Sequence, residues 1–188
     1  STSFPSRFYV EIPLEPTYVK EIEVGKAYKL GIEQSNLEKT IFATGELSGK
    51  YGVTTEDYAS GADVYFETAE GGYYVYFLNG EAKSYISATA TTAADGKVSY
   101  SLVYGEKSTV WTFDTEYFTL KANVEGTDVY FGCYNQYNTI SVSKFSYVST
   151  SFPSRFYVEI PLEPVYVKEI EVGKAYKLGV EQVNLDKT

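Results

Sequence analysis

The sequence contains no histidine, no methionine and only one cysteine, Cys133. Without histidine there is no imidazole base for a catalytic triad, and the commonest ligand of catalytic zinc is missing. A single cysteine forms neither an intrachain disulfide nor a thiolate metal cluster. No apolar run reaches the roughly 18–20 residues that a membrane-spanning helix needs. We therefore expect no enzymatic activity, no metal, no cofactor and no insertion into a membrane.

Positive charge is also scarce, because 16 Lys and Arg residues against 25 Asp and Glu residues leave a net charge of −9. A phosphate backbone repels such a chain, so we expect no nucleic-acid partner. Apolar residues make up 44% of the 188 residues, which is enough for a folded core. Tyrosine is the outlier, with 20 residues beside 11 Phe. Its ring favours strands and its hydroxyl tolerates water, as at interfaces.

A long internal repeat organises the chain, because residues 1–40 recur as residues 149–188 at an offset of 148. The two copies share 36 of 40 positions and differ only in the pairs Thr17/Val165, Ile32/Val180, Ser35/Val183 and Glu38/Asp186. We expect one full period of a tandem array followed by 40 residues of overlap. Since one folded unit has room for one copy of a segment, the surplus copy should pair with another segment or another molecule.

Proline-rich segments at 12–16 and 160–164 mark breaks in the chain, because each proline lacks an N–H and keeps its predecessor extended. They divide the sequence into five predicted parts. These are the last strand of a preceding repeat (1–12), a semi-rigid connector (13–24), a complete β unit (25–160), a second connector (161–172) and the first strand of a following repeat (173–188). A unit of about 1–148 is the alternative boundary.

Strict alternation of apolar and polar residues predicts strands throughout. Residues 7–12 place Phe8, Val10 and Ile12 on one face, and the same period recurs in 63–68, 97–104 and 117–124. Turn signals separate the strands, at Gly71, Gly80, Gly96 and Gly126 among others. We predict an all-β fold of short antiparallel strands in a barrel or sandwich.

Three segments, starting near 28, 74 and 129, share a further rhythm of an aromatic strand, a polar gap and a second strand. This rhythm resembles the threefold strand pairs of β-trefoil proteins, which makes a trefoil-like barrel the favoured architecture. An immunoglobulin-like sandwich is the alternative.

Two single residues and one loop are candidates for chemistry. Cys133 shares strand parity with inward-facing neighbours, which predicts a buried structural thiol. Trp111 is expected in the core, with an aromatic platform for a sugar ring as the alternative. The loop with Tyr134, Asn135, Gln136 and Tyr137 has the ring and amide chemistry of a glycan site, and it equally suits an exposed hairpin loop.

Near-identical, acidic, β-rich and cysteine-poor repeats resemble the tandem arrays of bacterial cell-surface proteins, such as adhesin stalks, or extracellular fibres. The resemblance implies a structural role outside the cell, with units joined head to tail through strand sharing or close docking. The partners would be copies of the chain or adjacent repeats. The residues expected at the junctions are Phe8, Val10, Ile12, Tyr18 and Ile22, with Phe156, Val158, Ile160, Tyr166 and Ile170 as their copies. The alternative function is an adhesin-type repeat that binds glycans.

Overall fold

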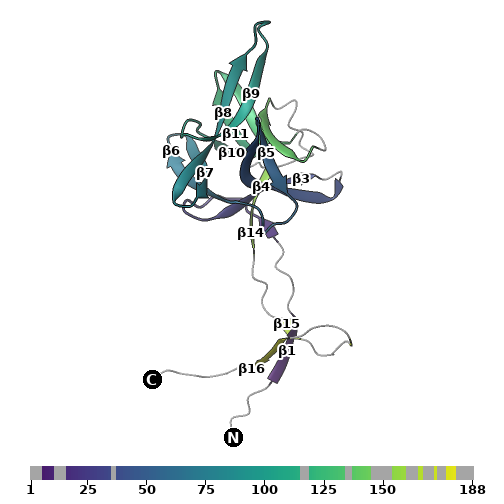
Figure 1. Ribbon diagram of the computed structural model, residues 1–188. Helices are drawn as coiled ribbons and strands as arrows, with labels where there is room; N and C mark the ends of the chain where they lie inside the picture. Colours follow the sequence, from purple (N-terminus) through teal and green to yellow (C-terminus); the bar gives the residue numbers. More distant parts are fainter. Residues whose placement is uncertain are drawn as a thin grey trace. The chain divides into compact units, whose positions relative to one another are not determined.

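The computed structural model describes residues 6–10, 16–34, 37–114, 119–133, 137–144, 154–159, 165–166, 172 and 177–180. They belong to two compact units. The large unit is Thr17–Val158, and the small unit combines Ser1–Pro16 with Glu159–Thr188. Both consist of β-strands (Figure 1), so the prediction of an all-β chain is confirmed. Within the described residues, no helix is long and apolar enough to cross a membrane.

The large unit is built around one antiparallel sheet. Its strands are β2 (Pro16–Tyr18), β3 (Tyr28–Gln34), β4 (Lys39–Ser48), β5 (Tyr51–Thr55), β6 (Asp63–Ala69), β7 (Gly72–Asn79), β8 (Ala82–Thr92), β9 (Val98–Gly105), β10 (Thr112–Asp114), β11 (Thr119–Val124), β12 (Thr127–Gly132), β13 (Thr139–Ser143) and β14 (Ser154–Glu159). The order is β10-β11-β12-β13-β5-β4-β3-β6-β7-β8-β9, and β14 lies off this path between β2 and β3. This order is that of an open sheet and does not show the expected barrel or trefoil.

Hairpins connect most neighbouring strands at the predicted glycines. Gly71, Gly80, Gly96 and Gly126 all have positive φ, between 61° and 80°. The β11–β12 turn also gives Glu125 a φ of 50°, so both central residues are left-handed. Two such residues form a type I′ turn, whose twist matches that of paired strands. The turn chemistry in the sequence therefore placed these hairpins correctly.

The core of the large unit is rich in aromatic rings. Alternation along β3 buries Tyr28, Leu30 and Ile32, each at most 2% exposed. Phe156 of β14 is fully buried, and its ring centroid lies 4.8 Å from that of Phe66 in an edge-to-face arrangement. Each such pair contributes about 0.5–1.5 kcal/mol beyond area burial. Strand β14 thus supplies a central part of the core.

Strand β14 is also the middle of a three-stranded arrangement, β2-β14-β3. Phe156 lies opposite Leu30 in the register with β3, and Ser154 lies opposite Ile32. On the other edge, the Val19 N–H donates to the Phe156 carbonyl at 2.8 Å. Both edges of β14 are therefore occupied, and we call β14 the closing strand.

The small unit repeats this arrangement with the duplicated segments. Its strands are β1 (Ser6–Val10), β15 (Val165–Tyr166) and β16 (Lys177–Val180), in the order β15-β1-β16. Phe8 lies opposite Leu178, and Ser6 lies opposite Val180. Adding 148 to the β1 numbers and subtracting 148 from the β16 numbers gives the β14–β3 register. The copy of the closing strand thus pairs with the copy of its acceptor.

Candidate functional site

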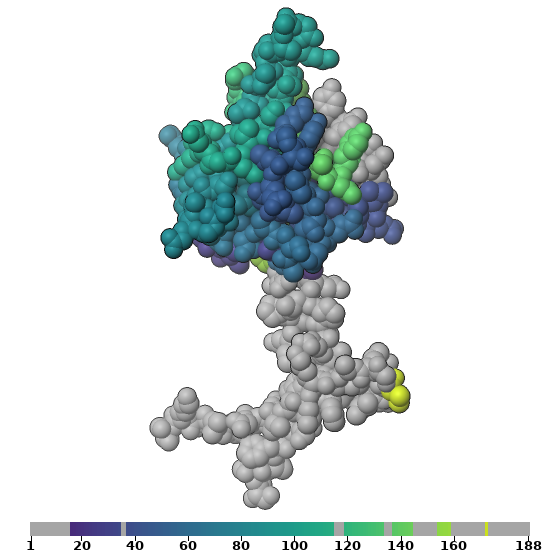
Figure 2. Space-filling model, in the orientation of Figure 1, coloured from purple at the N-terminus to yellow at the C-terminus, as the bar shows by residue number. Residues whose placement is uncertain are grey.

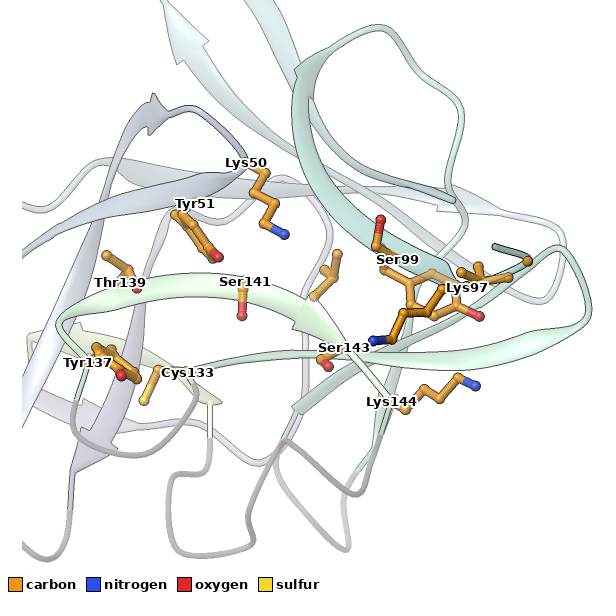
Figure 3. A pocket seen from close by; sticks show the side chains of 14 residues that line it. Lys50, Tyr51, Lys97, Ser99, Cys133, Tyr137, Thr139, Ser141, Ser143 and Lys144 are labelled. Carbon is orange, nitrogen blue, oxygen red and sulfur yellow. The ribbon is translucent and has the colours of Figure 1, made fainter. Parts of the chain in front are cut away.

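A groove of about 900 Å³ lies on the large unit where three parts of the chain meet (Figure 3). The β4–β5 hairpin contributes Lys50 and Tyr51, and the β8–β9 hairpin contributes Lys97 and Tyr100. Strand β13 and its flanks contribute the remaining wall. The β4–β5 hairpin (blue) and segment 137–144 (green) adjoin on the surface in Figure 2, as the pairing of β13 with β5 requires. We call this feature the lysine groove, and its third lysine is Lys144.

The β13 wall carries a row of hydroxyl groups. Thr139, Ser141 and Ser143 line the groove and are half-buried, whereas Ile140 and Val142 between them are buried in the core. This follows from the two-residue period of a strand, which places alternate side chains on opposite faces. The hydroxyl groups can donate and accept hydrogen bonds.

Tyr137 stands at one end of this row and is 60% exposed. Its main chain is anchored to the interior of the unit, because the amide Nε2 of Gln34 donates to the Tyr137 carbonyl at 3.2 Å. The same amide lies 3.9 Å from Sγ of Cys133, and Gln34 is fully buried. A buried amide thus fixes the chain on which an exposed ring is presented.

Cys133 belongs to the wall of the groove but not to its accessible chemistry. It is 1% exposed, and burial raises the pKa of its thiol. A protonated thiol is a poor nucleophile and a poor metal ligand. The prediction of a buried structural thiol is confirmed.

Charge distinguishes the groove from the rest of the surface. Among the described side chains, six lysines form ion pairs with carboxylates: Lys26, Lys29, Lys39, Lys83, Lys107 and Lys121. No residue lining the groove in the described part of the chain is an Asp or a Glu. Asp95 accepts the main-chain N–H of Lys97 at 3.0 Å, and its carboxylate forms no ion pair with the Lys97 ammonium. The groove is therefore a cationic site on an acidic protein.

The expected loop is only partly within the described structure. Tyr137 lines the groove, whereas Tyr134, Asn135 and Gln136 lie outside the described residues. The sequence reasoning missed the three lysines, although a signal was present. They follow one another at equal intervals of 47 residues, each preceded by Gly or Ser and followed two positions later by Gly or Ser.

Comparison of the chain with known protein families, with curated proteins and with solved structures found no match.

The function therefore rests on the residues of the chain itself. In the described part, no group of three or more His, Cys, Asp or Glu side chains is placed to hold a metal ion. The sugar-platform alternative for Trp111 is wrong, because this side chain is fully buried and its indole N–H donates to the Ile86 carbonyl at 2.7 Å.

Of the predicted junction residues, four come together inside the large unit. Phe156 is in the core, and Ile22 and Val158 pack against it. Tyr18 meets the Tyr157 ring edge-to-face at 6.3 Å. Phe8, Val10 and Tyr166 lie in strands β1 and β15, whose side chains are not described, and Ile12, Ile160 and Ile170 lie outside the described residues.

Polar contacts tie the closing strand to both of its neighbours. The Tyr157 hydroxyl donates to Oε1 of Glu33 at 2.8 Å, and Nη2 of Arg155 lies 3.3 Å from Oε2 of the same carboxylate. The Arg155 guanidinium also stacks 3.9 Å from the centre of the Tyr18 ring. Burial and the bond to Glu33 raise the pKa of Tyr157. These side chains come from β2, β3 and β14, so they fasten all three strands together.

A second cluster, of tyrosines and charges, lies on strands β6 to β8 and the segment that follows β9. Glu67 accepts hydrogen bonds from Lys107, from Lys83 at 2.8 Å and from the Tyr85 hydroxyl at 3.0 Å. These donors lower the pKa of Glu67 to about 2. Lys83 also lies 4.4 Å from the centre of the Tyr76 ring. Every charged group of the cluster has a partner, since both ammonium groups pair with the one carboxylate, which makes the cluster a structural feature of the sheet surface.

Proposed function

We propose that this chain belongs to an extracellular fibre or a bacterial cell-surface array built from repeats of 148 residues. Each repeat is a self-contained β unit joined head to tail with the next. The observation that carries the proposal is the recurrence of one register, in which β1 pairs with β16 as β14 pairs with β3. The role assigned is structural rather than catalytic.

The closing strand gives the proposal its physical basis. Phe156 fills a place in the core that only one strand can occupy, since both edges of β14 are already paired. The duplicated β1 finds the duplicated acceptor β16 instead. Recognition between the closing strand and its acceptor therefore lies in the strands themselves. In an array, each unit can then close with its own last strand. The closing strand covers the edge of β3, which therefore does not pair with a strand of another unit.

The connection between consecutive units is short. Five residues, 160–164, separate the end of β14 from the start of β15, and two of them are prolines. Five extended residues span at most about 18 Å. The length of this segment therefore sets an upper limit on the distance between the two strands that it connects.

We also propose that the large unit closes as a trefoil-like barrel. Two observations support this architecture over the alternative sandwich. Tyr73 of β7 and Trp111, next to β10, exchange two main-chain hydrogen bonds of 2.8 Å, which bring one end of the strand order to β7, the third strand from the other end. In addition, a lysine flanked by Gly or Ser occurs three times at intervals of 47 residues, at Lys50, Lys97 and Lys144, as expected for a threefold repeat.

The glycan-binding alternative is favoured by the lysine groove. Tyr137, which the sequence suggested as a ligand residue, lines this groove and exposes its ring there. A repeat that binds glycans remains compatible with an array, because many weak sites in one polymer bind with high avidity.

Force spectroscopy tests the array directly. A tandem protein carrying four copies of residues 13–160, each with its own closing strand, is stretched from its ends. If each unit closes by itself, we expect four separate unfolding events, each releasing about 500 Å of chain. Simultaneous release of several units would contradict self-contained closure. An antibody against the large unit should label intact, unpermeabilised source cells, and labelling only after permeabilisation would contradict an extracellular location.

A further inference from the structure

Lysines without carboxylate partners are concentrated in one place. Among the described lysine side chains, Lys20, Lys50, Lys97 and Lys144 form no ion pair. Three of these four line the lysine groove. Carboxylates are plentiful in a chain with a net charge of −9, and the other six described lysines form ion pairs with them. The groove therefore holds positive charge that the protein itself does not neutralise.

The three lysines come from corresponding positions of the chain. The interval from Lys50 to Lys97 equals that from Lys97 to Lys144, and the neighbouring Gly and Ser residues recur with it. In space the three positions meet at one groove. In Figure 3, Lys50 and Lys97 reach toward strand β13 from different sides. Charge gathered in a concave site attracts an anion more strongly than the same charge on a flat surface.

The uncharged residues of the groove indicate which chemical class of anion it can bind. Hydroxyl groups of Thr139, Ser141 and Ser143 follow one another at every second residue of β13. Tyr51 and Tyr137 are 42% and 60% exposed and offer ring surface beside them. The ammonium of Lys50 lies 5.4 Å from the centre of the Tyr51 ring, so charge and ring surface adjoin in the groove. A row of hydroxyl groups beside partly exposed aromatic rings suits a ligand that carries its own hydroxyl groups and an apolar ring face. A volume of about 900 Å³ is large enough for several sugar rings.

We infer that the lysine groove binds an acidic saccharide, with the lysines pairing to its carboxylate or sulfate groups. This inference rests on the glycan-binding alternative above and adds the ligand class and the residues. The ammonium groups of Lys50, Lys97 and Lys144 provide charge-assisted hydrogen bonds. The tyrosine rings stack on pyranose faces, and the β13 hydroxyls bond to sugar hydroxyls. An acidic peptide would also pair with the lysines, but Asp and Glu side chains offer no pyranose face to the tyrosine rings.

Binding of defined probes to the full chain tests the inference by titration calorimetry. The acidic probes are oligogalacturonate, sialyllactose and a sulfated heparin oligosaccharide. The neutral probe is methyl-esterified oligogalacturonate, which keeps the same backbone without its charge. Polyglutamate represents an acidic peptide. We expect at least one acidic saccharide to bind, with an affinity that falls as salt is added, while the ester and polyglutamate bind at least about tenfold more weakly.

Matched variants locate the site. Lys50→Gln and Lys97→Gln should each weaken binding of the acidic saccharide about tenfold, and Lys97→Arg should retain it. Lys20→Gln is the control, because it removes an equally unpaired lysine outside the groove. Tyr137→Ala should weaken binding without changing its salt dependence. Melting temperatures of all variants show whether each one still folds.

The outcomes separate this inference from the function on which it rests. Equal binding of the ester and the acid, unchanged in Lys50→Gln and Lys97→Gln, would overturn the acidic class and leave glycan binding in place. Binding of polyglutamate as tight as that of the saccharides would overturn the saccharide in favour of an acidic peptide. Absence of binding by every probe at millimolar concentration would overturn both glycan binding and the acidic site.

Discussion

Phe156 of the closing strand lies directly opposite Leu30 of β3, and both side chains are fully buried. The same pairing recurs between Phe8 and Leu178 in the small unit. The chain thus contains two copies of one strand in two different surroundings, which provides an internal control for experiments on closure.

Truncation of the closing strand should unfold the large unit selectively. Phe156→Ala removes a ring that packs against Phe66 at 4.8 Å, and we expect a loss of about 3–5 kcal/mol in the free energy of unfolding. Urea unfolding followed by the fluorescence of Trp111, the sole tryptophan, reports on this unit. Phe8→Ala is the matched control and should leave this transition unchanged. An equal shift in both variants would show that the two copies are interchangeable in the core.

The hydroxyl of Tyr157 should contribute to fastening the closing strand. Tyr157→Phe removes the hydroxyl, which donates to Glu33 and also has a hydrogen bond with the Thr40 side chain. We expect a loss of about 1.5–3 kcal/mol, the range for bonds to charged groups. Thermal unfolding of the large unit measures it. Tyr9→Phe, at the copied position in β1, should have no effect on that unit. A Tyr157→Phe variant as stable as the parent chain would mean that water replaces the bond.

Acid should weaken the cluster around Glu67. The folded pKa of about 2 lies below the ordinary value of 4.5, so the stabilising contribution is complete above about pH 4.5. As the pH falls through the folded value, the carboxylate is protonated and the contribution is lost. Glu67→Gln should therefore flatten the pH dependence of the melting temperature between pH 4.5 and 2. An unchanged profile in Glu67→Gln would contradict the lowered pKa, with Glu81→Gln as a surface control.

A methyl group at Gly72 should disturb the contact between Tyr73 and Trp111. A Cβ atom there would lie 2.2 Å from the Trp111 carbonyl oxygen, which is part of a rigid main-chain bridge. We expect Gly72→Ala to cost about 1–3 kcal/mol, as overpacking does, and to shift Trp111 fluorescence toward longer wavelength. Gly80→Ala is the comparison, because nothing lies within 4 Å of its Cβ and only its positive φ of 61° opposes the change. Native fluorescence in Gly72→Ala would show that the bridge is dispensable.

The alternation of residues allowed the strands to be predicted with good accuracy, because every second side chain of a strand must face the core. It also placed Trp111 and Cys133 inside, where the structure has them. Gly80 and Gly126 marked two of the hairpins, since positive φ is costly for other residues. Strand positions, the burial of single side chains and hairpin turns each depend on a few neighbouring residues, so they can be predicted from the sequence pattern.

The alternation of apolar and polar residues does not predict the lysine groove. Lys50 and Lys97 stand in turns where lysine is commonplace. The pairing of β13 with β5 brings Lys50 to the hydroxyl row, and the contact of β9 with β13 brings Lys97 there. The expected loop contributed Tyr137 alone. Long-range register cannot be derived from local alternation, because a strand with one apolar face fits several partners equally well.

The amino-acid sequence by itself determined that the chain is built of strands, that it repeats at 148 residues, and that one copy of residues 1–40 needs a second partner. Only the tertiary structure decided which partner that is. Strand β14 closes the large unit because the place beside Leu30 accepts one buried phenylalanine, and the copy in β1 pairs with β16, where the same residues recur. The two copies of the closing strand pair with their acceptors in the same register, and only the packing of side chains shows that the pairing of β14 with β3 lies in a core.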